Sequence, residues 1–342
     1  MRALVLSGGA AAGAYEAGVA YALTAAEQFD LVCGTSIGAI NAGLIAQGLY
    51  EDLRGVWASI AAARLTRLRP ELEVLRRIAE RVIAVRRSRA LSKVGASFGV
   101  LGELRHIREA HDLARVMSLL PWDPVVALME PRADLMALRS ALILCATNLT
   151  RGRAAAFYAF PSGQEDRAAA FREAEPSAIP LTVTNYVGAV CASAALPPAF
   201  EPVWLEDVEA KLCAFADGFV ASNTPIRQAI DGGATDLTVV FMDSAALRTG
   251  DRKVSNMADI VLTCSEVAQD RIIDLDLKLL RSINDRVMLG TAPGKRFINT
   301  RIIGPSVPLG LEAMDFDDQA IIDRVFALGV GDGEAAVRAA AG

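Results

Sequence analysis

Two consecutive units of strand, small-residue turn and helix occupy the first fifty residues, and they constrain the fold most strongly. The stretch RALVLSG predicts a buried strand, and the helical pattern AAAGAYEAGVAYALTAAEQ follows it. The unit repeats with the strand DLVCGTS and the helix IGAINAGLIAQGL. Such repeats are typical of α/β folds with parallel strands. We therefore expect an α/β fold: a three-layer sandwich whose mostly parallel central sheet is flanked by helices.

The remaining chain continues the same pattern. Strands are expected at SALILCATNL, AAAFYAF, CAFADG and DLTVVFMD, with an edge strand at KRFINTRII and a long amphipathic helix at 258–283. Residues 51–140 are mostly helical in pattern and are expected to form a cap or insertion. Residues 161–180 contain several breakers and predict a loop, and 331–342 predict a fraying tail. Without repeats or a flexible linker, residues 1–342 are expected to form a single domain.

Composition and charge exclude several classes of protein. A hydrophobic fraction of 53% with 22% charged residues indicates a globular chain with a large core. No uncharged run reaches the roughly 18 residues that span a bilayer, and the N-terminus lacks the pattern of a secretory signal. The five cysteines form no C-x-x-C pair, which favours buried free thiols. We expect a cytoplasmic protein, and the net charge of −5 argues against a nucleic-acid partner.

Ser36 lies in the sequence Gly34-Thr35-Ser36-Ile37-Gly38, which matches the G-x-S-x-G pattern of a nucleophile elbow. A nucleophile at a sharp strand-to-helix turn needs flanking residues without bulk, and glycine satisfies this need. Serine is also an ordinary N-cap residue of helices. The pattern alone therefore leaves two interpretations open: a nucleophile or a helix cap.

A histidine base for Ser36 is hard to find in this chain. The only two histidines are His106 and His111, in a charged helical segment. Their spacing of five does not align them on one helix face, so a metal site is not expected. A conventional triad places its histidine late in the chain. Ser36 is therefore either not catalytic or activated directly by a carboxylate.

The glycine turn after the first strand does not fit a nucleotide site. Ala10 stands where a G-x-G-x-x-G pattern beginning at Gly8 needs glycine. Ala14 and Tyr15 stand where a P-loop needs lysine and serine or threonine. What remains is a run of backbone amides at a helix N-terminus, which favours negative charge. That charge can belong to an anionic ligand or to the oxyanion of acyl transfer.

Four motifs in order resemble the patatin-like phospholipase family: LSGGAAAGAYEAGV, GTSIGAINA, ASAALPPAFEPV and ADGFVASNTPI, with a softer match at ATNLTRGR. The resemblance implies a lipid acyl hydrolase with a Ser–Asp dyad, in which Ser36 is the nucleophile and Asp217 the base. It also implies an oxyanion hole from the amides of Gly8, Gly9 and Ala10, and no metal or cofactor. The expected substrate is a phospholipid or another acyl ester.

The chain departs from the family pattern at three positions. Ala10 replaces the third glycine of the turn, and Ala12 replaces its basic residue, which weakens the case for an anionic headgroup. Phe219 follows Asp217-Gly218 where the family has a small residue, and we expect it to shape the substrate pocket. Two alternatives therefore stay open: a hydrolase of soluble esters or thioesters, and an inactive homologue that binds lipid or a protein partner.

A strongly basic segment spans residues 64–93, where ten basic residues outnumber three acidic ones. Its apolar positions recur at helical spacing, and Arg76, Arg77 and Arg81 lie mostly off that stripe. A basic amphipathic helix beside an esterase site fits peripheral contact with an anionic membrane surface. It equally fits a cap helix whose arginines face water.

Overall fold

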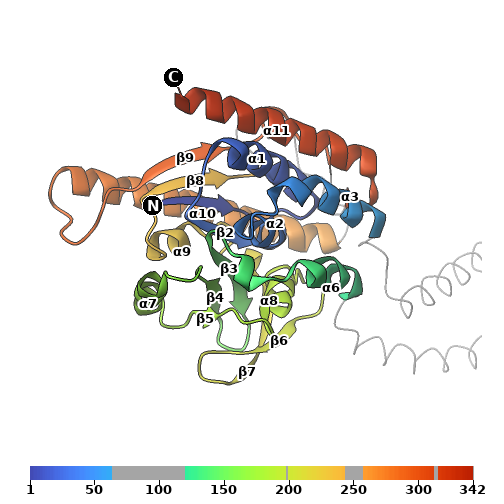
Figure 1. Ribbon diagram of the computed structural model, residues 1–342, viewed down its shortest axis with the longest axis horizontal. Coiled ribbons are helices and arrows are strands. Elements are labelled where there is room, and N and C mark those ends of the chain that lie inside the picture. Colours follow the sequence, from blue (N-terminus) through green and yellow to red (C-terminus); the bar gives the residue numbers. More distant parts are fainter. Residues whose placement is uncertain (64–119, 198, 243–256, 312–314, 342) are drawn as a thin grey trace, which may run out of the picture.

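A mixed β-sheet lies at the centre of the computed structural model, which describes residues 1–63, 120–197, 199–242, 257–311 and 315–341 (Figure 1). Its strands within these residues are β1 (Arg2–Leu6), β2 (Leu31–Thr35), β3 (Ala141–Asn148), β4 (Arg153–Ala159), β5 (Ile179–Pro180), β6 (Val203–Glu206), β7 (Leu212–Asp217), β8 (Asp236–Val240) and β9 (Asn299–Ile303). The main path runs β5-β4-β3-β2-β1-β8-β9, and β7 pairs with β3 and β6. The edge position expected for the last strand is confirmed.

Most strand pairs are parallel. This holds for β1–β2, β2–β3, β1–β8, β8–β9 and β4–β5. The β3–β4, β3–β7 and β6–β7 pairs are antiparallel. The parallel part contains the two N-terminal β–α units, because a strand followed by a helix returns the chain to the same edge of the sheet.

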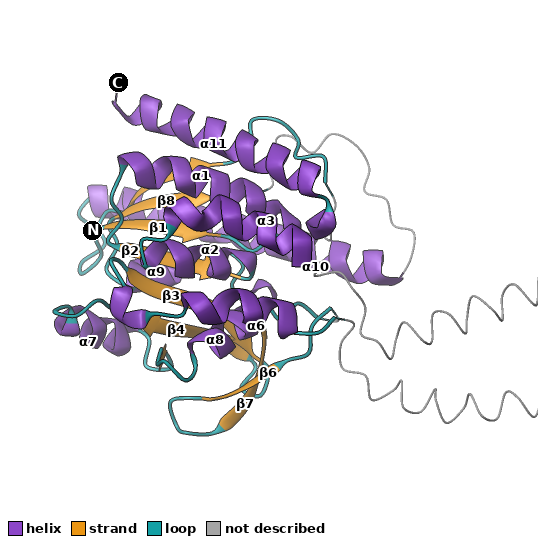
Figure 2. Ribbon diagram, turned by 45° about the vertical axis from the view of Figure 1, so that its right-hand side comes forward, coloured by secondary structure: helices purple, strands orange, loops and turns teal. Residues whose placement is uncertain are grey.

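Helices cover both faces of the sheet (Figure 2). The α-helices of the described residues are α1 (Gly13–Ala26), α2 (Ile37–Ala46), α3 (Leu53–Ala63), α6 (Asp123–Met129), α7 (Glu165–Ala174), α8 (Tyr186–Ser193), α9 (Ile226–Asp231), α10 (Met257–Met288) and α11 (Gln319–Ala341). Alternate residues of β1 face different cores, as a strand requires. Leu4 and Leu6 pack with residues of α1, α2, α3, α8 and α11, whereas Ala3 and Val5 pack with residues of α7, α9 and α10. The three-layer α/β sandwich expected from the sequence is confirmed.

The segment expected to be a loop at 161–180 contains the helix α7. Its breakers, Pro161, Gly163, Pro176 and Pro180, lie outside the ends of this helix and bound it. Phe171 of α7 is buried against Tyr158 of β4, with ring centroids 5.2 Å apart. One aromatic anchor on an otherwise polar helix thus ties the segment to the sheet.

The C-terminal residues are helical, so the expectation of a fraying tail at 331–342 is wrong through Ala341. They form the second half of α11, which lies along α1 (Figure 1). Glycines allow the two helices to approach closely. A Cβ at Gly329 would lie 2.1 Å from the carbonyl oxygen of Tyr15, and one at Gly18 would lie 2.1 Å from that of Phe326. Within the segment expected to be a tail, a Cβ at Gly333 would lie 2.9 Å from the carbonyl oxygen of Val19, so this glycine also serves close helix packing.

The expected helical cap at 51–140 is described only at its two ends. Leu53–Ala63 forms α3, which packs with α1 and α11 in one helical layer of the sandwich. Residues 120–140 contain α6 and short 3₁₀ turns. Residues 64–119 lie outside the described residues, so the cap stays a prediction for them.

Two further expectations concern cysteines and membrane crossing. Cys33, Cys145, Cys191 and Cys213 are buried free thiols, whereas Cys264 on α10 is exposed, contrary to the expectation. Among the described residues, no helix is both long and apolar enough to cross a membrane.

Candidate active site

The sheet topology brings Ser36 and Asp217 together. Strand β2 runs parallel to β3 and ends with Thr35 opposite Cys145. Strand β7 runs antiparallel to β3 on the same side and ends with Asp217 opposite Ala146. The two strands therefore meet end to end beside adjacent residues of β3. Ser36, the residue after β2, and Asp217, the last residue of β7, thus become neighbours, although 181 positions separate them in the sequence.

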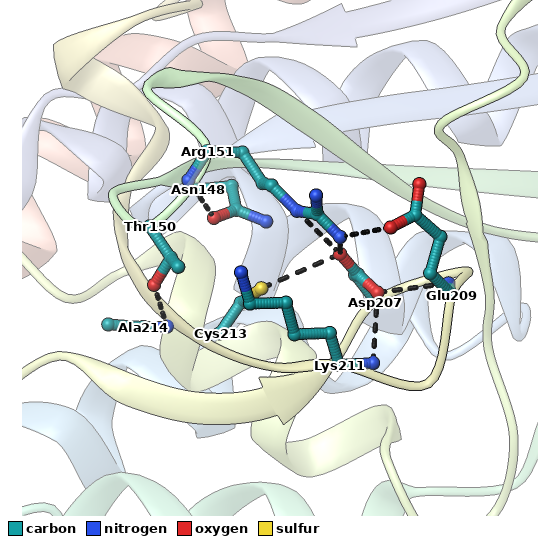
Figure 3. A network of polar contacts seen from close by, with 8 residues as sticks. All are labelled: Asn148, Thr150, Arg151, Asp207, Glu209, Lys211, Cys213 and Ala214. Carbon is teal, nitrogen blue, oxygen red and sulfur yellow. Dashed lines mark hydrogen bonds and ion pairs between the residues drawn. The ribbon is translucent and has the colours of Figure 1, made fainter.

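A polar network anchors β7 at the far end of its hairpin (Figure 3). Arg151, in the turn between β3 and β4, donates to Asp207 Oδ2 from Nε at 2.9 Å and from Nη2 at 2.6 Å. The other oxygen of Asp207 accepts from the amides of Glu209 and Lys211 in the β6–β7 turn. These bonds fasten the hairpin to β3. The softer motif ATNLTRGR thus has a structural role in holding the strand that carries Asp217.

The backbone of Ser36 forms a sharp elbow between β2 and α2. Its φ of 57° and ψ of −126° lie in a region that costs a non-glycine residue about 1–3 kcal/mol. The flanking glycines are required by contact: a Cβ at Gly34 would lie 2.2 Å from the carbonyl oxygen of Gly38. A Cβ at Gly38 would lie 2.7 Å from the carbonyl oxygen of Leu6. The G-x-S-x-G spacing is therefore a steric necessity of this turn.

The Ser36 hydroxyl is not a helix cap. It makes no capping hydrogen bond to α2 and instead donates to Asp217 Oδ2 at 2.6 Å. Ser36 retains 9% exposure and lines an apolar cavity. The position before the first residue of α2 also places the hydroxyl in the positive end of the helix dipole. Of the two interpretations left open by the sequence, the geometry favours the nucleophile.

Asp217 is a buried carboxyl oriented by two donors. Its Oδ1 accepts from the Phe219 amide at 2.7 Å, which leaves Oδ2 facing Ser36. Burial raises the pKa of Asp217 to about 7, against the lowering effect of the hydrogen bonds from Ser36 and Phe219. Gly218 is needed here because a Cβ would lie 2.4 Å from the carbonyl oxygen of Cys145. Such a carboxyl can exchange a proton with Ser36 near neutral pH.

The glycine turn lies next to Ser36, but only part of it is free to donate. A Cβ on Gly8 would lie 3.1 Å from Ser36 Cβ. The Gly8 amide, expected as an oxyanion donor, already donates to the carbonyl oxygen of Asn223 at 3.1 Å. Within the described residues the amides of Gly9 and Ala10 donate to no acceptor. Ala10 has a φ of 51°, a left-handed conformation that explains why the family prefers glycine there.

An apolar cavity of about 50 Å³ adjoins Ser36. Trp122 and Phe200 stack in its wall, with ring centroids 4.3 Å apart. Phe219, which we expected to shape a substrate pocket, is not among the described lining residues; its backbone instead orients Asp217. The described lining residues are Ala10, Ser36, Ile37, Ile40, Leu120, Trp122, Val125, Ala194, Leu196, Ala199, Phe200 and Phe316.

Several residues around the site were not anticipated from the sequence. Asn223 binds Gly8 of the glycine turn through two hydrogen bonds. Its carbonyl oxygen accepts from the Gly8 amide, and its side-chain amide donates to the Gly8 carbonyl oxygen at 3.3 Å. Glu16 is fully buried behind the turn, accepts from Asn41 at 3.0 Å, and has its pKa raised well above the usual range by burial. The Asn-x-Pro block containing Asn223 was visible in the sequence, but its contact with the turn was not. Arg76, Arg77, Arg81, His106 and His111 lie outside the described residues, so the membrane contact stays a prediction.

Comparisons with known proteins identify the family of this chain. The comparison with curated proteins found no match. Among solved structures, VipD from Legionella pneumophila is similar at 15% identity and a TM-score of 0.40, over 99% of this chain and 67% of that one. The model of the patatin-like phospholipases matches residues 4–230, which include both Ser36 and Asp217. Membership of this family indicates a hydrolase of lipid acyl esters. Because this model matches about two thirds of its length, the chain belongs to the patatin-like phospholipase family.

Proposed function

We propose that this chain is a serine carboxylic-ester hydrolase that cleaves lipid acyl esters through a Ser36–Asp217 dyad. The observation that carries the proposal is the 2.6 Å hydrogen bond from Ser36 Oγ to a fully buried carboxylate oxygen of Asp217. Two further features beside the same hydroxyl support it: an apolar cavity, and the amides of Gly9 and Ala10, which donate to no acceptor within the described residues. These are the parts that acyl transfer needs: nucleophile, base, oxyanion donors and an acyl site.

Acylation begins with attack of Ser36 Oγ on the ester carbonyl carbon, while Asp217 Oδ2 takes the hydroxyl proton. The carbonyl oxygen becomes an oxyanion, and the amides of Gly9 and Ala10 stabilise its charge. The tetrahedral intermediate then expels the alcohol, whose oxygen takes the proton back from Asp217. The result is an acyl-enzyme on Ser36 and a carboxylate at Asp217.

Deacylation repeats these steps with water in place of the serine. Asp217 accepts a proton from the water that attacks the acyl-enzyme carbonyl. When the second tetrahedral intermediate collapses, Ser36 Oγ leaves and recovers that proton from Asp217. The fatty acid departs, and the dyad returns to its starting state without any cofactor.

The cavity supports a lipid acyl chain in preference to a small polar acyl group. Its described lining is apolar apart from Ser36 itself. Burial of each methylene group in such a site contributes about 0.8 kcal/mol. A longer acyl chain should therefore be a better substrate than acetate until the cavity is filled.

Turnover of two substrate types tests the proposal. We expect release of fatty acid from phospholipid vesicles and lysophospholipid micelles. We also expect a higher kcat/KM on p-nitrophenyl butyrate than on the acetate. Ser36→Ala protein provides the blank for contaminating esterases. Turnover of the acetate alone, with no fatty acid from either lipid, would favour the soluble-ester alternative and contradict the lipid assignment.

The rate of ester hydrolysis should depend on pH through Asp217. Only the carboxylate form of Asp217 accepts the Ser36 proton, and burial raises its pKa to about 7. We therefore expect kcat/KM on an uncharged ester to fall about tenfold per pH unit below that value and to level off above it. Initial rates between pH 5 and 9 measure this, with circular dichroism confirming the fold at each pH. A midpoint near pH 4, typical of an exposed aspartate, would contradict the role of burial.

A further inference from the structure

The serine of the ASAALPP block, Ser193, has a place in the site that the proposed reaction does not use. It is the last residue of α8 and is fully buried. Its hydroxyl donates to the carbonyl oxygen of Cys145 at 2.5 Å. Ser193 Oγ itself accepts a hydrogen bond from the backbone amide of Ser36 at 3.0 Å. One hydroxyl thus bridges β3 and the elbow that carries the nucleophile.

The same short segment also holds the other member of the dyad. Two residues after Ser193, the carbonyl oxygen of Ala195 accepts the backbone amide of Asp217 at 2.9 Å. The last residue of α8 and the short segment after it therefore bind the amides of Ser36 and Asp217, respectively. These bonds lie where β2 and β7 meet beside β3, a junction at which the regular strand ladder is interrupted.

The hydroxyl matters because the Ser36 amide has no strand partner at the elbow. Thr35 is the last residue of β2, and the left-handed φ of Ser36 turns the chain out of the sheet. A buried N–H group without an acceptor is unfavourable, and a strained backbone persists only when its surroundings determine it. Since the Ser193 proton points to Cys145, a lone pair of its oxygen faces the Ser36 amide.

We propose that Ser193 is a positioning residue, which fixes the backbone of Ser36 so that Oγ stays in line with Asp217 and with the incoming carbonyl. The role rests on the proposed hydrolase function. Ser193 takes no proton and touches no substrate. Its loss would let the elbow relax, and a displacement of about 1 Å at a reacting atom can lower a rate about 10²-fold.

Three variants test this role. Ser193→Ala removes the bridge, and Ser193→Cys keeps the shape but replaces the hydroxyl with a poor hydrogen-bonding group. Ser140→Ala is the matched control, because its buried hydroxyl also donates to a backbone carbonyl, that of Phe29 at 2.6 Å, away from the dyad. We expect both Ser193 variants to lower kcat, and the rate of fluorophosphonate labelling, about 10²-fold with KM changed less than threefold. Ser140→Ala should remain within twofold of wild type in both.

Amide hydrogen exchange at Ser36 gives a readout that does not depend on turnover. The amide should exchange faster in both Ser193 variants and be unchanged in Ser140→Ala. An active wild type whose folded Ser193 variants keep kcat, labelling rate and Ser36 protection would overturn the inference and leave the hydrolase proposal intact. A wild type with neither turnover nor labelling overturns the hydrolase proposal first, and the positioning role with it.

Discussion

Replacing Ser36 with alanine should lower kcat for ester hydrolysis roughly 10⁶-fold, the magnitude typical of losing a serine nucleophile. Alanine removes the one atom that attacks the carbonyl and leaves the elbow glycines in place. Oxyanion donors and substrate binding remain, so a small residual rate over the uncatalysed reaction is expected. Initial rates on a p-nitrophenyl ester, compared with the buffer blank, measure this loss.

The control for Ser36→Ala is a serine whose loss leaves the elbow untouched. Ser140→Ala removes a buried hydroxyl that bonds to Phe29 and should retain wild-type turnover. Circular dichroism and thermal melting should show that both variants fold. A folded Ser36→Ala protein with turnover within tenfold of wild type would exclude Ser36 as the nucleophile.

Asp217→Asn should lower kcat about 10²–10⁴-fold, the usual contribution of a general base. Asparagine has the shape of aspartate and can still accept the Phe219 amide, but its amide group cannot take the Ser36 proton. Because nucleophile and base act as a unit, Ser36→Ala combined with Asp217→Asn should be no slower than Ser36→Ala alone. Rates of the two single variants and the double variant form the test.

A carboxylate away from the dyad provides the comparison for Asp217→Asn. Asp231, which pairs with Arg227 on α9, can be changed to asparagine with little expected effect on turnover. Near-normal turnover of folded Asp217→Asn protein would require another base. In that event, the pH midpoint expected near 7 would also have to be assigned to another group.

The central sheet was predictable because its signals are local. Buried apolar runs followed by small residues marked β1 and β2, and two β–α units predicted parallel pairing. The errors arose where tertiary contacts override local tendency. Residues 331–342 suggested a fraying tail, yet Gly333 in this segment lies against Val19 of α1 and permits close helix packing. The polar helix α7 depends on Phe171, whose aromatic partner is on another strand.

The candidate dyad could be predicted only in part, for a similar reason. The G-x-S-x-G pattern occupies five consecutive residues, so Ser36 is visible in sequence, although Gly38 is also required by its contact with Leu6 of β1. The partners of Ser36 are not local: Ser193 is 157 positions away and Asp217 is 181 positions away. A family motif marks Asp217 in the sequence, whereas the role of Ser193 depends on contacts that only the folded chain brings together. The bond between the Gly8 amide and Asn223 likewise removes a donor that the motif alone would count.

Covalent labelling with a fluorophosphonate probe tests the nucleophile most directly. The wild-type protein should gain the mass of one probe less HF, because fluoride leaves when Ser36 Oγ attacks phosphorus, and peptide mapping should locate the adduct on Ser36. Ser36→Ala protein should gain none, while Ser140→Ala should label like wild type. If the folded wild type stays unlabelled, or if the probe attaches elsewhere and Ser36→Ala labels equally, Ser36 is not an activated nucleophile. The chain would then be an inactive member of its family.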